Sequence, residues 1–151
     1  MRKEVIVHDN FNIRDYRQDD YQDVSKLWEI TGLGYTIRGD NENIILNTIK
    51  AGGKLLILED TSTGAVCGTS WMTCDGRRIH LHHFGIHPDY QGKGLSKMLL
   101  ADSLAFVKDK KLQVKIEVHQ ENLKAIKLYT KYGFKRLGDY DIYIIRDLNE
   151  I

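Results

Sequence analysis

The chain has 151 residues, of which 42% are hydrophobic and 28% are charged, with a single proline. This length is near the usual size of one globular domain, and this composition excludes a disordered protein. The formal net charge of +1 provides no overall field that would attract nucleic acid or an anionic membrane, so any anion site must be local. We therefore expect one folded domain over residues 1–151, with neither nucleic acid nor membrane as a partner.

The N-terminus lacks the apolar core of a signal peptide, and no segment approaches the roughly 20 apolar residues that span a bilayer. These absences predict a cytoplasmic protein. The two cysteines, Cys67 and Cys74, do not have the spacing of a zinc finger, and we expect two free thiols. No bound metal is expected.

The first half of the chain reads as a strand, two helices and an antiparallel meander. Helical spacing of apolar residues and cap or breaker residues predict helices after Asp19 or Asp20 and over Asn41–Ala51. Alternating segments separated by turn residues predict strands, which cover Ile13–Tyr16, Leu55–Glu59, Ala65–Met72 and Arg78–Ile86.

The second half reads as a crossover followed by a helix and two closing strands. A helix of about four turns follows a glycine-rich loop, and the β-branched strand Val114–Val118 comes next. A strand, helix, strand connection favours parallel pairing of Arg78–Ile86 with Val114–Val118. A last helix, Leu123–Tyr132, stops at Gly133, and two further strands are expected over Phe134–Leu137 and Tyr140–Ile145.

The loop between the strand Arg78–Ile86 and the next helix has the features of a phosphate site. Gly92 and Gly94 allow the backbone to approach an anion closely, and the following helix presents unpaired N–H groups with a positive dipole end. Lys93 and Lys97 add local positive charge. The Walker and Rossmann patterns do not fit, so on glycine spacing alone an ordinary capped turn stays an equal alternative.

Two motifs that follow one another along the chain favour the phosphate site over an ordinary capped turn. The segment Gln91-Gly92-Lys93-Gly94-Leu95-Ser96 resembles motif A of the GNAT N-acetyltransferase superfamily, although Ser96 replaces the usual glycine or alanine. The segment from Asn122 to Phe134, with Leu128-Tyr129 and Gly133-Phe134 at the family's offsets, resembles motif B. The resemblance implies an α/β (α+β) fold with a mixed, mostly antiparallel sheet of about seven strands and about four flanking helices.

The resemblance also implies acetyl-CoA as the cosubstrate. In this family the sheet is splayed between the strand before the loop and the strand after the next helix, here Phe84–Ile86 and Ile116–Val118, and the pantetheine arm lies in that gap. The cofactor-binding residues that follow are Phe84, Gly85, Ile86, Gln91, Gly92, Lys93, Gly94, Leu95, Ser96, Asn122 and Tyr129.

Candidate catalytic residues follow from the same resemblance. Tyr129 matches the family's general acid, and its ordinary pKa of about 10 keeps it protonated at neutral pH. The general base is left open between Glu117 and the pair His80 and His82, whose imidazoles share one strand face, with His83 pointing oppositely. Solvent-facing positions for these residues, or a metal site built on the histidines, are the competing interpretations.

The acceptor is expected to be a primary amine, either a small molecule or a peptide N-terminus, attacked directly in a ternary complex. Trp28, Tyr35, Arg38 and Trp71 are the candidate acceptor-binding residues. Two other functions remain: an acyl-CoA sensor or partner module without turnover, and a metal-dependent hydrolase or metal-storage protein on the histidines. The sequence leaves a homodimer open.

Overall fold

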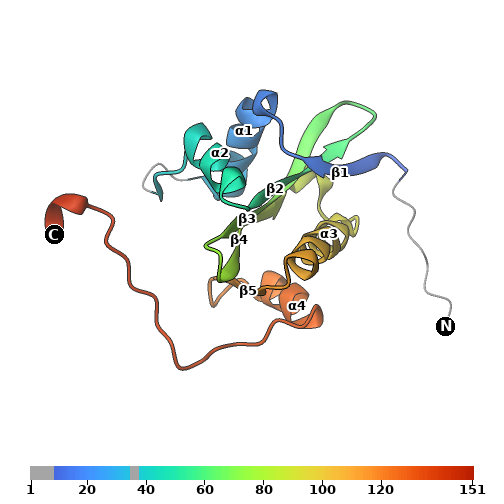
Figure 1. Cartoon of the computed structure of the whole chain (residues 1–151). Helices are drawn as coiled ribbons and strands as arrows, with labels where there is room; N and C mark the ends of the chain where they lie inside the picture. The colour runs from blue at the N-terminus through green and yellow to red at the C-terminus, as the bar shows by residue number, and fades with distance from the viewer. Residues whose placement is uncertain (1–8, 35–37) are drawn as a thin grey trace.

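The computed structural model describes residues 9–34 and 38–151, and in them five strands and four α-helices follow one another along the chain (Figure 1). Among the described residues, short 3-10 turns over Gln18–Asp20, Pro88–Tyr90 and Leu148–Glu150 join or end these elements. The helices and strands are β1 (Phe11–Asp15), α1 (Tyr21–Thr31), α2 (Glu42–Lys50), β2 (Lys54–Asp60), β3 (Ala65–Cys74), β4 (Arg78–Ile86), α3 (Leu95–Lys110), β5 (Gln113–Ile116) and α4 (Leu123–Lys131).

The five strands form one mixed sheet in the order β1-β2-β3-β4-β5. The first three pairs are antiparallel, and β4 pairs with β5 in parallel, as the α3 crossover between them requires. The mixed, mostly antiparallel sheet and the four helices are therefore confirmed, and so is the parallel partnership of the strands on either side of α3.

The expectation of about seven strands is wrong for the described chain, which has five. The two predicted closing strands, Phe134–Leu137 and Tyr140–Ile145, lie outside the sheet, and the segment after α4 extends away from the body of the molecule (Figure 1). Tyr140–Ile145 has the apolar and partly β-branched composition of a strand, but a strand also needs a neighbour to pair with. In the described chain neither segment pairs with any of the five strands.

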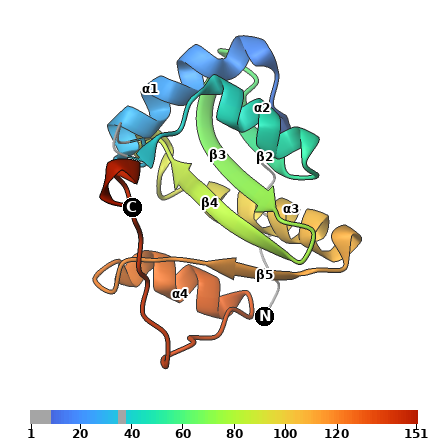
Figure 2. The same ribbon diagram turned by 60° about the vertical axis from the view of Figure 1, so that its left-hand side comes forward.

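Helices cover both faces of the sheet and bury two apolar clusters (Figure 2). On one face α1 and α2 pack over β2 and β3, in a cluster that includes Val24, Trp28, Ile45, Ile57 and Trp71. On the other face α3 and α4 pack against the sheet, in a larger cluster that includes Leu58, Met72, Leu81, Leu99 and Tyr129. Successive residues along a strand point to opposite faces of the sheet, so they pack into different clusters.

Local interactions fix the starts of the first two helices. The Asn41 side chain accepts a hydrogen bond from the Ile44 N–H at 3.0 Å and caps α2. Asp20 precedes α1, as predicted, but its carboxylate is engaged at 2.8 Å by Arg14 of β1. Arg14 also pairs with Glu59 of β2, so one guanidinium ties the start of α1 to the sheet.

The sheet splits between β4 and β5. Their pairing runs from Arg78 opposite Gln113 to Leu81 opposite Ile116 and ends there, although β4 continues to Ile86. A register shift in the β3–β4 ladder coincides with a positive φ of 41° at His83, which marks a bulge in β4. A bulge bends and twists its strand, so β4 turns away from β5 and opens a gap between the strands.

Candidate active site

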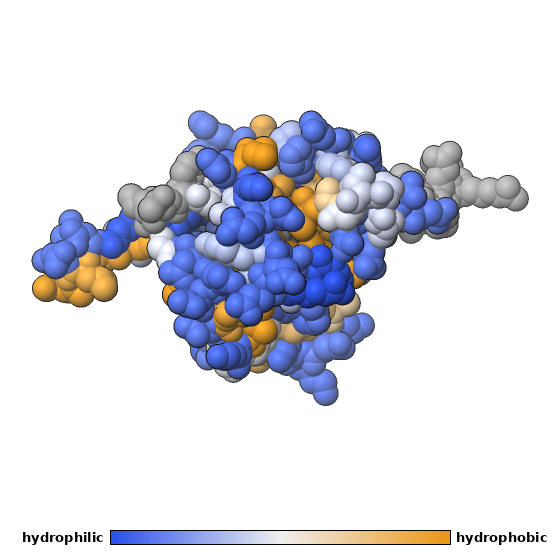
Figure 3. Space-filling model, turned by 90° about the horizontal axis from the view of Figure 1, so that it is seen from above, coloured by the Kyte–Doolittle hydropathy of each residue, from blue (hydrophilic) through white to orange (hydrophobic). Residues whose placement is uncertain are grey.

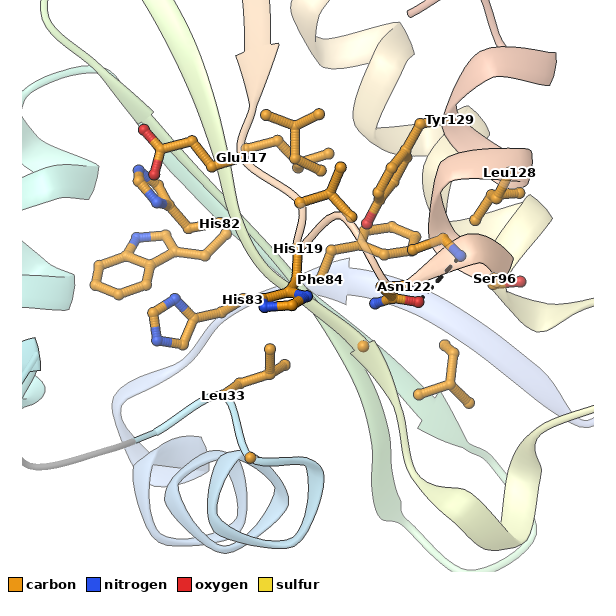
Figure 4. Close-up of a pocket in the computed structure, with 18 of the residues that line it drawn as sticks. Leu33, His82, His83, Phe84, Ser96, Glu117, His119, Asn122, Leu128 and Tyr129 are labelled. Atoms are coloured by element: carbon orange, nitrogen blue, oxygen red, sulfur yellow. Dashed lines mark hydrogen bonds between the residues drawn. The ribbon is translucent and has the colours of Figure 1, made fainter. Parts of the chain in front are cut away.

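A cavity of about 1510 Å³ extends along this gap. Its walls come from the second half of β4, the glycine loop, the first turn of α3, the chain just after β5, and α4 (Figure 4). Elements far apart in the sequence therefore meet at one site. The predicted splay of the sheet, between Phe84–Ile86 and Ile116–Val118, is the position where the cavity opens.

The glycine loop forms the end of the cavity next to α3. Gly92 and Gly94 have φ values of 79° and 76°, a left-handed backbone conformation that residues with a Cβ rarely adopt. The Gln91 amide donates to the Ile86 carbonyl at 2.9 Å and closes the loop onto the end of β4. The Tyr90 hydroxyl donates to Asp60 Oδ2 at 3.0 Å and anchors the loop to β2.

The N-terminus of α3 is open toward an anion. Gly94 occupies the N-cap position and provides no side-chain cap, and the first turn contains no acidic residue. The first N–H groups of a helix have no intrahelical acceptor and carry the positive end of the dipole. This end of the cavity can thus receive a phosphate or pyrophosphate through the backbone alone.

The structure brings most of the predicted cofactor residues to one cavity. The residues that line it are Phe84, Gly85, Ile86, Gln91, Gly92, Gly94, Leu95, Ser96, Asn122 and Tyr129. Lys93 lies apart, with its Nζ 5.3 Å from the centre of the Tyr90 ring. Asn122 also caps α4 by accepting from the Ala125 N–H at 3.2 Å, so its side chain has a structural task.

Tyr129 projects from α4 to the middle of the cavity and is 7% exposed (Figure 4). Its ring packs edge-on against Phe84 of β4 and against Phe134, with centroid distances of 5.9 and 5.7 Å. Burial raises the pKa of Tyr129 to about 12, because a phenolate is poorly solvated there. The hydroxyl therefore keeps its proton at neutral pH.

His80, His82 and Glu117 lie together on the other side of the gap. The two imidazoles stack with a centroid distance of 3.9 Å, as their shared strand face predicted. Glu117 follows β5, and its Oε1 lies 3.8 Å from His80 Nε2. The two alternative bases of the sequence analysis are thus neighbours, in a row that runs from His82 through His80 to the half-exposed carboxylate.

Both imidazoles of this row are held in the neutral form. Burial, reinforced by the nearby His80 and His83, lowers the pKa of His82 to about 4. Burial also lowers the pKa of His80, while Glu117 acts in the opposite direction. His82 Nε2 lies 2.8 Å from the Thr73 hydroxyl, which orients the ring from β3.

His83 was predicted to point away from His82, and this is wrong. Its ring lies 5.1 Å from Trp71 and 4.4 Å from Trp28, on the side of the sheet where His82 also meets Trp71. The bulge at His83 breaks the alternation on which the prediction relied. A register shift of this kind leaves no sign in a pattern of single residues.

His83 and Asp40 form a buried polar pair that the sequence analysis did not assemble. The His83 side chain is 6% exposed, and its Nε2 lies 3.2 Å from Asp40 Oδ2, at ion-pair distance. Neither ring nitrogen makes a hydrogen bond of good geometry to the described residues. Both side chains border the cavity, so hydrogen-bonding capacity is available at the wall opposite the glycine loop.

The predicted acceptor residues occupy different positions. Trp71 and Arg38 line the cavity. Trp28 stacks on Trp71 at 5.5 Å and donates its indole N–H to Thr69, so it lies one layer behind the wall, in the core. Tyr35 lies outside the described residues.

Three further features complete the description of residues 9–34 and 38–151. No three side chains among their His, Cys, Asp and Glu residues come together as a metal site. No described helix is long and apolar enough to cross a bilayer. Cys67 and Cys74 are free thiols, as expected, and burial raises the pKa of Cys67 to about 12.

The chain combines a split mixed sheet with a glycine loop and an uncapped helix N-terminus at one end of the split, and these features together define a class of protein. Residues 12–134 match the Acetyltransferase (GNAT) family, and the chain belongs to this family. A curated acetyltransferase of Yersinia pestis is 28% identical over 131 residues, which cover 82% of this chain and 86% of the relative.

Solved structures agree on the fold. A GNAT-family acetyltransferase of Staphylococcus aureus Mu50 superposes with a TM-score of 0.75 at 18% identity, covering 87% of this chain and 88% of the other. The ribosomal-protein-S18-alanine N-acetyltransferase of Escherichia coli gives 0.70 at 18% identity, with 83% and 77% covered. A putative acetyltransferase of Salmonella typhimurium, solved with its cofactor acetyl-CoA, gives 0.69 at 19% identity, with 83% and 80% covered.

Proposed function

We propose that this acetyltransferase moves an acetyl group from acetyl-CoA to a primary amine, by direct attack within a ternary complex. The observation that carries the proposal is the cavity itself. One end offers an uncapped helix N-terminus and left-handed glycines for a pyrophosphate, and the split between β4 and β5 continues from it to Tyr129.

The described residues fit this cosubstrate. Gly92 has no atom within 4 Å of the place where a Cβ would stand, so the loop keeps open space for an anion. Beyond Leu81 and Ile116 the facing edges of β4 and β5 no longer pair, and they can meet the amides of an extended pantetheine arm. Gly92, Gly94, Leu95 and Ser96 would hold the pyrophosphate, and the bound thioester would supply the acetyl group.

The reaction needs two proton transfers, and residues on opposite walls of the cavity would carry them out. The amine must lose a proton before it attacks, and the neutral imidazoles of His82 and His80, together with the carboxylate of Glu117, can pass that proton to water. Because its pKa is about 4, His82 does not stay protonated at neutral pH, so it passes the proton on. Glu117 is 46% exposed, which gives the row its outlet to solvent.

Tyr129 supplies the opposite transfer. As the new C–N bond forms and the C–S bond breaks, the departing sulfur needs a proton, and an ordinary thiol has a pKa of about 8.5. A phenol whose pKa is about 12 is protonated at neutral pH and can donate from Oη as the thiolate develops. The attacking nitrogen gives up a second proton as the adduct collapses to the amide, and that proton restores Tyr129 through solvent, so the proton passed to water before the attack is the only one released overall.

The acceptor is proposed to enter over Arg38, Asp40 and Trp71, the cavity wall formed by β3 and the connection between α1 and α2. The carboxylate of Asp40 attracts the ammonium form of an amine to this wall, and Glu117 adds a second negative charge near the gap. Small amines and peptide N-termini both satisfy this chemistry, so the acceptor class is a primary amine.

The deciding experiment measures thiol release from acetyl-CoA over a panel of amines and N-terminal peptides, with mass spectrometry of the acceptor. We expect release that depends on the amine and matches acetylated product one to one. Tight CoA binding with no turnover on any acceptor would contradict catalysis and support a binding-only sensor instead.

A further inference from the structure

A second, smaller cavity lies at the start of β4, next to the turn that joins this strand to β3. Its volume is about 350 Å³, and the residues that line it are Thr73, Asp75, Arg77, Arg78, His80 and Lys115. Thr73 and His80 also line the large cavity, so the two cavities meet beside the stacked imidazoles of His80 and His82. The small cavity therefore opens next to the residues that are proposed to carry the amine proton.

Positive charge dominates this small cavity, which we call the basic pocket. Arg77, Arg78 and Lys115 contribute three cations, and Asp75 is the one carboxylate among the described residues that line it. Asp75 Oδ1 accepts the backbone N–H groups of Arg77 and Arg78 at 2.8 and 2.7 Å, so the carboxylate is engaged within the turn. These hydrogen bonds hold the pKa of Asp75 below its usual range. A concave surface with a surplus of one sign of charge attracts the opposite ion, here an anion.

The two arginines of the basic pocket keep their charge available. Arg78 donates from Nη1 to Gln113 Oε1 at 2.6 Å, across the β4–β5 pair that sets these two residues opposite each other, and this acceptor is a neutral amide. Within residues 9–34 and 38–151 neither Arg77 nor Arg78 forms an ion pair, and Lys115 approaches Glu117 only at 4.0 Å. A guanidinium binds carboxylate or phosphate through paired, charge-assisted hydrogen bonds, so the pocket suits either anionic group.

The basic pocket is separate from the proposed pyrophosphate site. Arg78 is the first residue of β4, and the glycine loop comes after Ile86, the last residue of the same strand. At about 3.3 Å per residue, these two ends of β4 are roughly 26 Å apart. A pyrophosphate bound at the glycine loop therefore leaves the basic pocket free for the acceptor.

The histidines lie on the side of the sheet that α1 and α2 cover in part. These helices pack over β2 and β3, and the surface seen from above them is largely hydrophilic, with hydrophobic side chains in separate patches (Figure 3). That surface suits contact with water. On β4, beside the helices, Arg78, His80 and His82 follow one another at intervals of two residues and so share one face of the strand. An acceptor on this face meets the histidines and the basic pocket together.

We propose that the basic pocket binds an anionic group of the acceptor, so that the substrate class is a primary amine that also carries a carboxylate or a phosphate. This inference rests on the proposed function, because it places the reacting amine at His82 and His80. The Cα atoms of Arg78 and His82, four residues apart on one strand, are separated by about 13 Å. The amine and the anionic group of the acceptor are therefore at most about 13 Å apart, the length of roughly four residues of extended peptide.

The first test compares acceptors that differ only in one anionic group. The pairs are 6-aminohexanoate with 6-aminohexanamide, 6-aminohexyl phosphate with 6-aminohexanol, and the C-terminally amidated peptides Ala-Glu-Ala and Ala-Gln-Ala. We expect kcat/KM to be at least about tenfold higher for the anionic member, because one charge-assisted contact supplies that difference. The pair with the largest ratio identifies the source of the anion as a free carboxylate, a phosphate or a peptide side chain. Equal values within all three pairs would overturn the proposal.

Substitution of the two arginines tests the pocket itself. In Arg77→Gln/Arg78→Gln the preference for the anionic acceptor should fall to within about twofold of none, and Arg77→Gln alone, in the exposed turn, should lower it in part. The preference is a ratio measured on one preparation, so a loss of folded enzyme cancels. The matched control is Lys26→Gln, which removes one positive charge at an exposed position of α1 and should keep the ratio of the native chain. An unchanged ratio in the double variant would contradict the proposal.

A binding measurement separates this inference from the proposed function. The arginine Nε–H signals of the native chain are followed by NMR while 6-aminohexanoate is added, with 6-aminohexanamide as the control and the arginine variants as the assignment. The signals of Arg77 and Arg78 should shift with the carboxylate and not with the amide, and this readout requires no turnover. Shifts without acetylation of any amine would support the anion site and contradict the proposed function. Acetylation of amines without these shifts would contradict the anion site alone.

Discussion

The two ends of the cavity are built in different ways. The end formed by the glycine loop and α3 relies on backbone groups: left-handed glycines, an uncapped helix and the open edges of split strands. The end near Trp71 relies on side chains that distant segments bring together, chiefly His80, His82, His83 and Glu117. The backbone end suits a cosubstrate that many proteins share, and the side-chain end suits a particular acceptor.

Tyr129 stands between the two ends, and its removal should produce the largest loss of turnover. Tyr129→Phe keeps the ring against Phe84 and removes only the proton donor, so kcat should fall by about 10²–10³-fold while CoA affinity stays within about twofold. Steady-state kinetics and calorimetric titration with CoA measure the two effects. Unchanged turnover would remove Tyr129 from the proposed chemistry.

The row of His82, His80 and Glu117 should act as a unit. Glu117→Gln and His82→Asn should each lower kcat by about tenfold, because water replaces part of the relay. The double variant should lose little more than either single variant, since residues in one path are not additive. Fully multiplicative losses would show that the two side chains act independently.

His82 should also make stability depend on pH. Its pKa is about 4 in the folded chain, against about 6.5 when unfolded, so the unfolded state binds more protons between these values. Its contribution to the free energy of unfolding is fully present above about pH 6.5 and falls as the pH drops toward 4. Urea unfolding should show a loss of about 2 kcal/mol between pH 7 and pH 5 from this group.

The matched pair for this measurement is His82→Asn and His119→Asn. His82→Asn should lose most of that dependence on pH, because the buried titrating group is gone. His119 is exposed, and His119→Asn should behave like the unaltered chain. Identical pH dependence in His82→Asn and the unaltered chain would contradict the low pKa of His82.

The sequence predicted the backbone end of the site better than the side-chain end. Gly92, Gly94 and Asn122 lie in two short motifs whose residues are close together in the chain, and the resemblance to the family rests on those motifs. His83 could not be placed, since the bulge that turns it depends on how β3 and β4 pair. The proximity of Glu117 to His80 depends in turn on the parallel register that sets His80 opposite Lys115.

The two predicted closing strands show the same limit of prediction from local sequence. Tyr140–Ile145 has the composition of a strand, and that composition predicts a closing strand of the sheet. Pairing is a property of two segments, however, and in the described chain this segment pairs with none of the five strands. Local composition therefore indicates a tendency to form a strand, but it does not predict whether the segment pairs.

The most direct test of the proposed cosubstrate site is calorimetric titration of CoA into Gly92→Asp and Gly64→Asp. Both glycines have positive φ, 79° and 74°, and neither has an atom within 4 Å of the place where a Cβ would stand, so the two variants carry the same backbone strain. Only Gly92 lies at the proposed pyrophosphate site. We predict that Gly92→Asp weakens CoA binding by at least about 100-fold, because a carboxylate repels the anion there, and that Gly64→Asp binds normally. Equal affinity in both variants would contradict a pyrophosphate site at this loop.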